Sequence, residues 1–149
     1  AAATLVGDAL KGWIGVYLAQ WLAGADAIGV IAIAAVAVTL GHMYPVFFRF
    51  QGGKGVATTF GVLLALNVYV AAGAFATWAI IAAFFRISSL AAIVAAAFAS
   101  FFTLLLYDVR HPYFAAVTFI CALLVWRHRN NIRKLMAGTE SRIGASRDA

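Results

Sequence analysis

Residues 68–107 read VYVAAGAFATWAIIAAFFRISSLAAIVAAAFASFFTLLLY, forty residues in which Arg86 is the single charged side chain. A helix that crosses a membrane needs about 20 mostly apolar residues, each rising 1.5 Å. The stretch is long enough for two such helices, and Arg86 divides it near its middle. It therefore predicts two consecutive membrane spans, residues 68–85 and 88–106.

The composition of the whole chain agrees with this interpretation. Of its 149 residues 65% are apolar and 11% are charged, whereas soluble domains average about 45–50% and about 25%. A soluble domain of this size could not hide so much apolar surface, and disorder requires low hydrophobicity. With one cysteine, Cys121, a disulfide scaffold is excluded as well. We predict an all-α, polytopic integral membrane bundle.

Four further apolar segments bring the prediction to about six transmembrane helices. They are residues 4–22, 27–44, 55–66 and 112–126. Segment 55–66 is short, so one long tilted span over 55–85 is the alternative. A turn near Asn67 places ten of the eleven Lys and Arg residues on one face and only Arg110 opposite. Because basic residues collect in cytoplasmic loops, this count favours six spans with the basic face in the cytoplasm.

The net charge of +6 would indicate nucleic-acid binding in a soluble protein, but in a membrane protein it marks topology. All the larger polar clusters share the basic face. They are Asp8 with Lys11, and residues 42–54, 86–89 and 127–140. This asymmetry indicates a site that faces the cytoplasm. The spans lack the string of acids and histidines that a proton-coupled transporter usually needs.

The most informative polar stretch is GHMYPVFFRFQGGKGVAT, residues 41–58. A Gly-Gly-Lys-Gly turn before a helix predicts a phosphate site, since glycines let backbone N–H groups turn inward and the helix N-terminus is positive. The alternative is an interfacial turn from which Lys54 reaches toward water. The Walker pattern does not fit, because Phe48 and Gly55 occupy positions that require Gly and Ser/Thr.

Several neighbours of this turn have two open interpretations. His42 either donates to a phosphate or caps a helix end, and it has no second ligand at metal-binding spacing. The phenylalanines at 47, 48 and 50 are more typical of interfacial anchors than of an acyl-chain wall. Asp8 and Lys11, three residues apart, are predicted to form a structural ion pair.

The polar residues that follow later spans are also ambiguous. Ser89 either caps the helix at 88–106 or contacts a phosphate. The basic run at 127–140 is expected to continue the last span as a helix to near Gly138, where it marks topology or binds anionic headgroups. Its His128 and Asn131 could also contact a phosphate. We expect one transmembrane domain, 1–137, and a short cytoplasmic tail, 138–149.

Together these motifs resemble those of the bacterial acyl-phosphate:glycerol-3-phosphate acyltransferases. GHMYPVF at 41–47 and FQGGKGVAT at 50–58 resemble the central motif of that family. RISSL at 86–90 is similar to its next motif. RHRNNI at 127–132, with GTE at 138–140, is similar to its C-terminal motif, and DALKG at 8–12 matches too. The matches are in order and run from one end of the chain to the other.

The resemblance implies a multi-pass enzyme of the cell inner membrane that acts in phospholipid synthesis, with its active site facing the cytoplasm. Such enzymes transfer a fatty acyl group from acyl phosphate to the 1-hydroxyl of glycerol 3-phosphate, giving lysophosphatidic acid and phosphate. It implies no metal, no cofactor and no obligate protein partner. Acyl phosphate is already activated, so no covalent nucleophile is needed, and Cys121 lies in mid-span.

The resemblance also implies roles for individual residues. The candidate catalytic residues are Lys54, His42, Ser89 and Asn131, and the candidate substrate-binding residues are Gly52, Gly53, Gly55, His128, Arg86 and Glu140. Lys54 and the glycines would hold a substrate phosphate, with His42 supporting that motif. Ser89, His128 and Asn131 would complete the phosphate pockets. Glu140 would have a structural or positioning role.

Two further expectations follow. The family has seven spans, and its first is followed by a Gly/Ser/Asn-rich loop for which nothing before Ala1 provides a counterpart, so we expect a truncated or incompletely represented member. The competing hypothesis is a small membrane carrier or binding protein for anionic lipids or phosphorylated metabolites. Spans rich in Ala and Gly also suit close helix packing.

Overall fold

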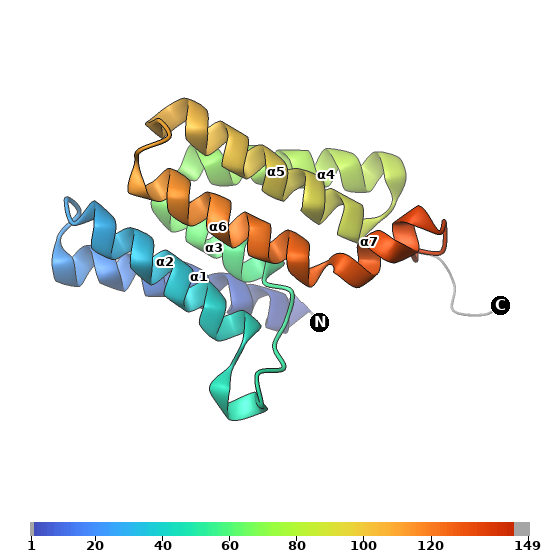
Figure 1. Ribbon diagram of the computed structural model, residues 1–149, viewed down its shortest axis with the longest axis horizontal. Helices are drawn as coiled ribbons and strands as arrows, with labels where there is room; N and C mark the ends of the chain where they lie inside the picture. Colours follow the sequence, from blue (N-terminus) through green and yellow to red (C-terminus); the bar gives the residue numbers. More distant parts are fainter. Residues whose placement is uncertain (1, 145–149) are drawn as a thin grey trace.

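The structure is a computed structural model that describes residues 2–144. Over that range the chain forms α-helices and one 3₁₀ turn, with no strand (Figure 1). The elements are α1 (Ala2–Ala23), α2 (Ile28–Met43), η1 (Val46–Phe48), α3 (Val56–Leu66), α4 (Val68–Phe85), α5 (Ser88–Tyr107), α6 (Pro112–Arg127) and α7 (Arg129–Met136). Each of the six predicted spans corresponds to one helix from α1 to α6, so the all-α prediction is confirmed.

The helices differ in how well they suit a bilayer. By length and hydropathy, three segments are long and apolar enough to cross one: Ile28–Phe48, Val68–Phe85 and Ser88–Tyr107. Val56–Leu66 and Pro112–Arg127 are apolar but shorter. At 1.5 Å per residue, α3 measures about 17 Å, well short of a hydrocarbon core of about 30 Å. By itself α3 is therefore too short to cross the hydrocarbon core.

The predicted turn near Asn67 is confirmed. The Asn67 side chain accepts hydrogen bonds from the amides of Tyr69 (2.9 Å) and Val70 (3.2 Å), which caps the first turn of α4. Phe60 and Phe75, almost equally far from Asn67 along the chain, have ring centroids 5.8 Å apart. That contact requires α3 and α4 to run antiparallel, as a hairpin.

Helices α1 and α3 touch backbone to backbone. A Cβ atom at Gly12 would overlap the carbonyl oxygen of Thr58, and one at Gly61 would overlap the carbonyl oxygen of Ala9. Small residues of this kind let membrane helices approach closely. Such close packing stabilises helix association in a bilayer, because the hydrophobic effect does not drive helices together in lipid. The two glycines thereby fix where the start of α3, and the turn before it, lie.

The two ends of the bundle differ in polarity. In Figure 1 the N-terminus and α7 lie toward one end of the bundle, and the α1–α2 and α5–α6 turns lie at the other. The first of these ends carries the polar clusters predicted to share a face, and Arg110 lies in the α5–α6 turn at the second end. Arg147, the last basic residue counted on the polar face, falls outside the described residues.

One local expectation is wrong, and one of the two open interpretations of Ser89 is excluded. The basic run does not continue the last span, because α6 ends at Arg127 and His128 (φ −91°, ψ 5°) turns the chain before α7 begins. The His128 amide is shared between the carbonyl oxygens of Leu124 (3.1 Å) and Val125 (3.0 Å), a tightened last turn of the kind that ends an α-helix. Ser89 does not cap α5, since Ile87 is the capping residue and the Ser89 hydroxyl donates to Glu140 instead.

The predicted tail, residues 138–149, is described as far as Gly144, and 145–149 lie outside the described residues. Its first part folds back against the start of α5. The amide of Ile143 donates to the Arg86 carbonyl at 2.6 Å, and the Arg86 guanidinium donates to the Ile143 carbonyl at 2.9 Å. We call residues 139–144 the C-terminal strap.

The α1–α3 contact predicts that Gly61→Ala destabilises the protein. The added methyl meets a backbone oxygen that cannot rotate away, so the helices must separate, and overpacking of this kind costs about 1–3 kcal/mol. Gly7→Ala is the matched control, because a Cβ at Gly7 meets nothing within 4 Å. We expect a lower thermal unfolding midpoint in detergent for Gly61→Ala and no decrease for Gly7→Ala. Equal midpoints would contradict the close contact.

Candidate functional site

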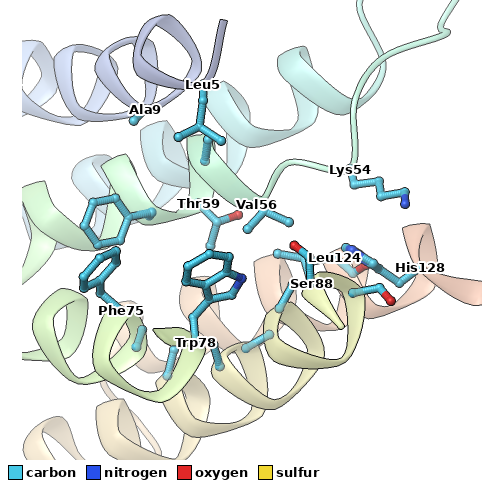
Figure 2. Close-up of a pocket in the computed structure, with 18 of the residues that line it drawn as sticks. Leu5, Ala9, Lys54, Val56, Thr59, Phe75, Trp78, Ser88, Leu124 and His128 are labelled. Carbon is cyan, nitrogen blue, oxygen red and sulfur yellow. The ribbon is translucent and has the colours of Figure 1, made fainter. Parts of the chain in front are cut away.

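A cavity of about 770 Å³ opens between α1, α3, α4, α5 and α6 and reaches α7 (Figure 2). Its body is apolar, and its polar residues gather where α7 and the strap meet it. The wall includes Leu5, Phe60, Phe75, Trp78, Ala96 and Leu124. The polar group comprises Lys54, Ser89, His128, Asn131, Glu140 and Arg142. We call this polar end the mouth. The shape suits a ligand with a long apolar part and a polar head.

The small side chains of α5 leave the space for this cavity. At intervals of three and four residues that helix presents only small side chains to the cavity: Ser88, Ser89, Ala92, Ala95, Ala96 and Ala99. Residues at these intervals share one helix face. Across from them, α4 contributes Phe75 and Trp78, whose rings lie farther from the mouth (Figure 2). Larger side chains on α5 would close the space.

Four mouth residues form one chain of hydrogen bonds. The Lys54 Nζ donates to Asn131 Oδ1 at 2.7 Å, and Asn131 Nδ2 donates to Glu140 Oε1 at 2.6 Å. The Ser89 hydroxyl donates to the same Glu140 oxygen at 2.6 Å. The chain joins the turn before α3, helix α7, the strap and α5. Candidate residues from three separate motifs are thereby brought together.

Glu140 holds this chain together as an ionised carboxylate. Burial by itself raises the pKa of Glu140, but the hydrogen bonds from Ser89 and Asn131, with the charges of Lys134 and Lys54, outweigh it and lower the pKa below its ordinary value. Lys54 meets Asn131 rather than the carboxylate. Its ammonium has two further protons to donate, so it can bind an anion at the mouth.

His128 is the most buried polar residue of the mouth, with 1% of its surface exposed. Its Nδ1 lies 2.8 Å from the Leu124 carbonyl oxygen, which can only accept, so Nδ1 carries the proton. Burial lowers the pKa of His128, and the Lys54 charge adds to this, against opposing effects of the Leu124 hydrogen bond and Glu140. The neutral ring therefore presents the Nε2 lone pair.

The glycine turn forms a second part of the site and does not line the cavity. Gly55 (φ 82°) precedes α3 in the left-handed conformation that glycine adopts without strain. Within residues 2–144 the amide N–H groups of residues 52–55 donate to no other protein group. With the free N–H groups of the first turn of α3, they form a concentration of donors beside Lys54.

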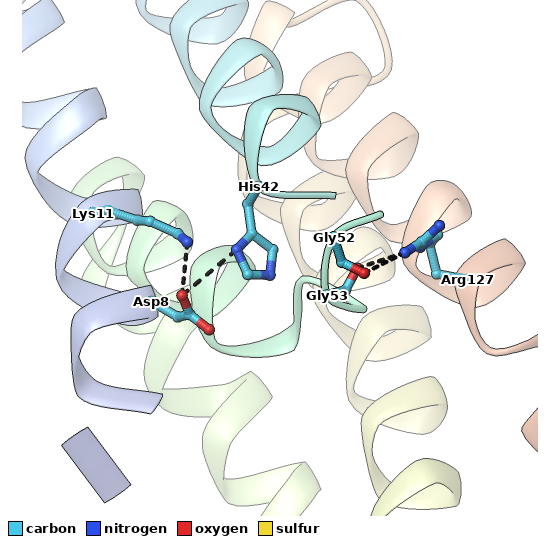
Figure 3. Close-up of polar contacts among 6 residues, drawn as sticks. All are labelled: Asp8, Lys11, His42, Gly52, Gly53 and Arg127. Atoms are coloured by element: carbon cyan, nitrogen blue, oxygen red, sulfur yellow. Dashed lines mark hydrogen bonds and ion pairs between the residues drawn. The ribbon is translucent and has the colours of Figure 1, made fainter. Parts of the chain in front are cut away.

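His42 lies beside this turn and away from the mouth, in the last turn of α2. A Cβ at Gly53 would lie 2.5 Å from its Nε2. Its Nδ1 is 3.6 Å from Asp8 Oδ1, the oxygen that also accepts from Lys11 at 2.7 Å (Figure 3). The predicted Asp8–Lys11 pair is confirmed. His42 packs against the glycine turn, which fits a supporting position better than one at the mouth.

Arg86 also lies apart from the cavity wall. Its left-handed backbone (φ 57°) ends α4, and its guanidinium binds the strap through Ile143. It thus holds the segment that carries Glu140. Of the ten candidate residues, five line the cavity (Lys54, Ser89, His128, Asn131 and Glu140), and five do not (His42, Gly52, Gly53, Gly55 and Arg86).

The residue that sequence reasoning missed is Arg127. Its guanidinium Nη2 donates to the carbonyl oxygens of Gly52 (2.6 Å) and Gly53 (3.1 Å), 75 and 74 residues away along the chain. In the sequence it is one arginine of a basic run that marks topology. Arg127 is also the first residue of the RHRNNI motif, and that membership was the signal in the sequence.

No metal centre is evident in the part of the chain that the structure describes, where no three His, Cys, Asp or Glu side chains gather. The aromatic residues of η1 and its flank point outward instead of lining the cavity, with Phe47 97% exposed. That exposure agrees with the interfacial-anchor interpretation and not with an acyl-chain wall.

Comparison with known proteins places these features in a family. The family model described as glycerol-3-phosphate acyltransferase matches residues 1–138. A glycerol-3-phosphate acyltransferase of Burkholderia thailandensis is 59% identical over 142 residues, which cover 95% of this chain and 70% of the relative. One of Burkholderia pseudomallei strain K96243 is 58% identical over 142 residues, with the same coverage of both chains.

Two solved structures are similar as well. Both are of PlsY (YgiH), an integral membrane glycerol 3-phosphate acyltransferase. Its glycerol 3-phosphate form is 40% identical with a TM-score of 0.89, and the match covers 96% of this chain and 70% of that one. Its lysophosphatidic acid form is 39% identical with a TM-score of 0.88, covering 96% and 72%. The fold of an integral membrane helical bundle is thereby shown.

The surroundings of His128 predict a low pKa that depends on Lys54. In NMR titrations of histidine-labelled protein, we expect the His128 resonance to titrate below 6.5, the ordinary value for histidine. In Lys54→Met the pKa of His128 should rise toward that value, because a neighbouring positive charge is removed. The chain has three histidines, so His128→Gln assigns the signal. A wild-type pKa at or above 6.5 would refute this description of the mouth.

Proposed function

The chain belongs to the glycerol-3-phosphate acyltransferase family, and from this membership we propose that it transfers a fatty acyl group from acyl phosphate to the 1-hydroxyl of glycerol 3-phosphate. The products are lysophosphatidic acid and inorganic phosphate. The observation that carries the proposal is the junction of an apolar cavity with a cationic, donor-rich mouth. An acyl phosphate has this same division between an apolar chain and an anionic head.

In this proposal the acyl chain of the donor lies along the small-residue face of α5. The apolar wall stabilises it as any buried hydrocarbon is stabilised, by about 0.8 kcal/mol for each buried CH₂ group. The phosphate of the donor lies at the mouth, within reach of the Lys54 side chain and of the amide groups of Gly53 and Lys54. Helix α3 begins there, so its positive end faces the anion.

The acceptor binds on the other side of the mouth. Ser89, Asn131 and His128 offer neutral donors and acceptors around the Lys54–Asn131–Glu140 chain, and they suit the hydroxyls and phosphate of glycerol 3-phosphate. Arg86 acts through the strap that carries Glu140. That a family member has been solved in a glycerol 3-phosphate form and a lysophosphatidic acid form supports this choice of acceptor and product.

The proposed reaction needs no covalent enzyme intermediate. The 1-hydroxyl oxygen attacks the acyl carbonyl carbon, a new ester C–O bond forms, and the C–O bond to phosphate breaks with its electron pair. The hydroxyl proton passes to the departing phosphate. The protein gathers two anions, aligns hydroxyl with carbonyl and stabilises the developing charge. Cys121 is buried in the α6 part of the cavity wall, and it takes no part in the proposed reaction.

The proposed location is the cell inner membrane, with the mouth facing the cytoplasm. Of the ten basic residues that the structure describes, all but Arg110 belong to the polar clusters of the mouth end, which supports this orientation. We propose that the enzyme works without metal, cofactor or obligate protein partner. A carrier of anionic lipids or phosphorylated metabolites was the competing hypothesis, and no feature of the described residues favours it over acyl transfer.

Lys54→Ala tests this proposal directly. In acyl-transfer assays on the complete gene product in lipid vesicles, we expect kcat/KM to fall by about 10²-fold or more, as for removal of one donor that stabilises reaction charge. Arg133→Ala is the control, an exposed basic residue on α7 outside the cavity wall, and should leave the rate near that of the wild type.

Three outcomes would contradict the proposal. Phosphate release that does not depend on both substrates would show that another reaction occurs. Full activity of Lys54→Ala would remove the proposed site. Movement of glycerol 3-phosphate or lipid across vesicles without ester formation would favour the carrier.

A further inference from the structure

Arg127, the last residue of α6, contacts the glycine turn. In Figure 3 its side chain approaches Gly52 and Gly53 from one side, while His42 lies on the other. Its single Nη2 atom donates to both carbonyl oxygens, at 2.6 Å and 3.1 Å. Its guanidinium carbon is also 5.1 Å from the ring centre of Tyr44, a stacking contact that orients the planar group.

These two hydrogen bonds fix the orientation of the carbonyl groups and also that of the N–H groups that follow them. The carbonyl of Gly52 and the N–H of Gly53 belong to one planar trans peptide group, and so do the carbonyl of Gly53 and the N–H of Lys54. In a trans peptide group the carbonyl C=O and the N–H point in opposite directions. When Arg127 holds both carbonyls, both N–H groups must therefore point away from it, and neither donates to another group within residues 2–144.

Contacts with α2 prevent the glycine turn from moving away from Arg127. A Cβ at Gly52 would overlap the His42 carbonyl oxygen, and one at Gly53 would lie 2.5 Å from His42 Nε2. On its other side the His42 Nδ1 lies 3.6 Å from Asp8 Oδ1 of α1. The glycine turn is thus confined between Arg127 on one side and His42 on the other, and glycine is required at both positions.

We propose that Arg127 is a positioning residue for the substrate phosphate. It acts through the carbonyls of Gly52 and Gly53, which it holds so that the N–H groups of Gly53 and Lys54 face the anion. It does not line the cavity, and the anion does not touch it. This inference rests on the proposed function, since it assumes that the glycine turn binds a phosphate during acyl transfer.

Arginine suits this role better than lysine. Its planar group can donate to two acceptors in fixed directions and stack on Tyr44 at the same time. A lysine carries the same charge on a shorter, rotating ammonium, so it can restore charge without restoring the geometry. This difference separates positioning from simple attraction of anions.

The test compares Arg127→Met and Arg127→Lys with Arg129→Met in the complete gene product. Arg129 is the matched control, since it stacks on Trp126 at 5.4 Å and contacts no residue of the glycine turn. The probe is inorganic phosphate, measured as a competitive inhibitor of acyl transfer, alongside KM and kcat for both substrates. Thermal unfolding midpoints identify any variant that fails to fold.

We expect Arg127→Met to raise the inhibition constant of phosphate and one substrate KM by on the order of tenfold or more, with a smaller change in kcat. Arg127→Lys should recover only part of the loss, and the defect should persist in high salt. Arg129→Met should match the wild type in all three constants.

Two results would overturn the inference alone. One is an Arg127→Met variant with unchanged phosphate inhibition and KM, while Lys54→Ala is inactive. The other is full rescue by Arg127→Lys together with a defect that vanishes in high salt, which would mean long-range attraction. Failure of the proposed function is distinguishable, because then the wild type transfers no acyl group or Lys54→Ala retains full activity.

Discussion

A charge at the centre of a bilayer costs about 2.5–3.5 kcal/mol on insertion scales, and this cost governs where the chain can place its chemistry. The spans therefore carry almost no ionisable groups, and the hydroxyls of Thr39, Thr77 and Thr103 donate to carbonyl oxygens of their own helices. Polar residues collect at one end of the bundle. An apolar ligand part can enter among the helices, while its charged part must stay at that end.

The site is then assembled by contacts between distant segments. The Gly12 and Gly61 contacts set α3 against α1 and so place the turn before α3. Arg127 holds that turn from α6, and Asn131 and Glu140 join Lys54 to Ser89. None of these groups is a strong ligand by itself. The combination gives one cationic mouth above a cavity that the alanines of α5 keep open.

Much of the fold was predictable, because apolar segments identify the membrane spans and the distribution of basic residues identifies the loops on one side of the bilayer. The turn at Asn67 followed from counting basic residues, and the Phe60–Phe75 contact confirms it. The break at His128 was not predictable, since residues 127–136 have a good helical pattern and no glycine or proline marks the end of α6. The same is true of Arg127, whose partners lie about 75 residues earlier. Such long-range hydrogen bonds leave no local trace.

The most direct test of the central claim is a structure of the complete gene product with a hydrolysis-resistant acyl phosphate analogue. We predict that its phosphate accepts hydrogen bonds from the amides of Gly53 and Lys54 and from Lys54 Nζ, with the acyl chain along Ala92, Ala95 and Ala96. A phosphate bound away from the glycine turn, or an acyl chain on the outer surface of the bundle, would contradict the account.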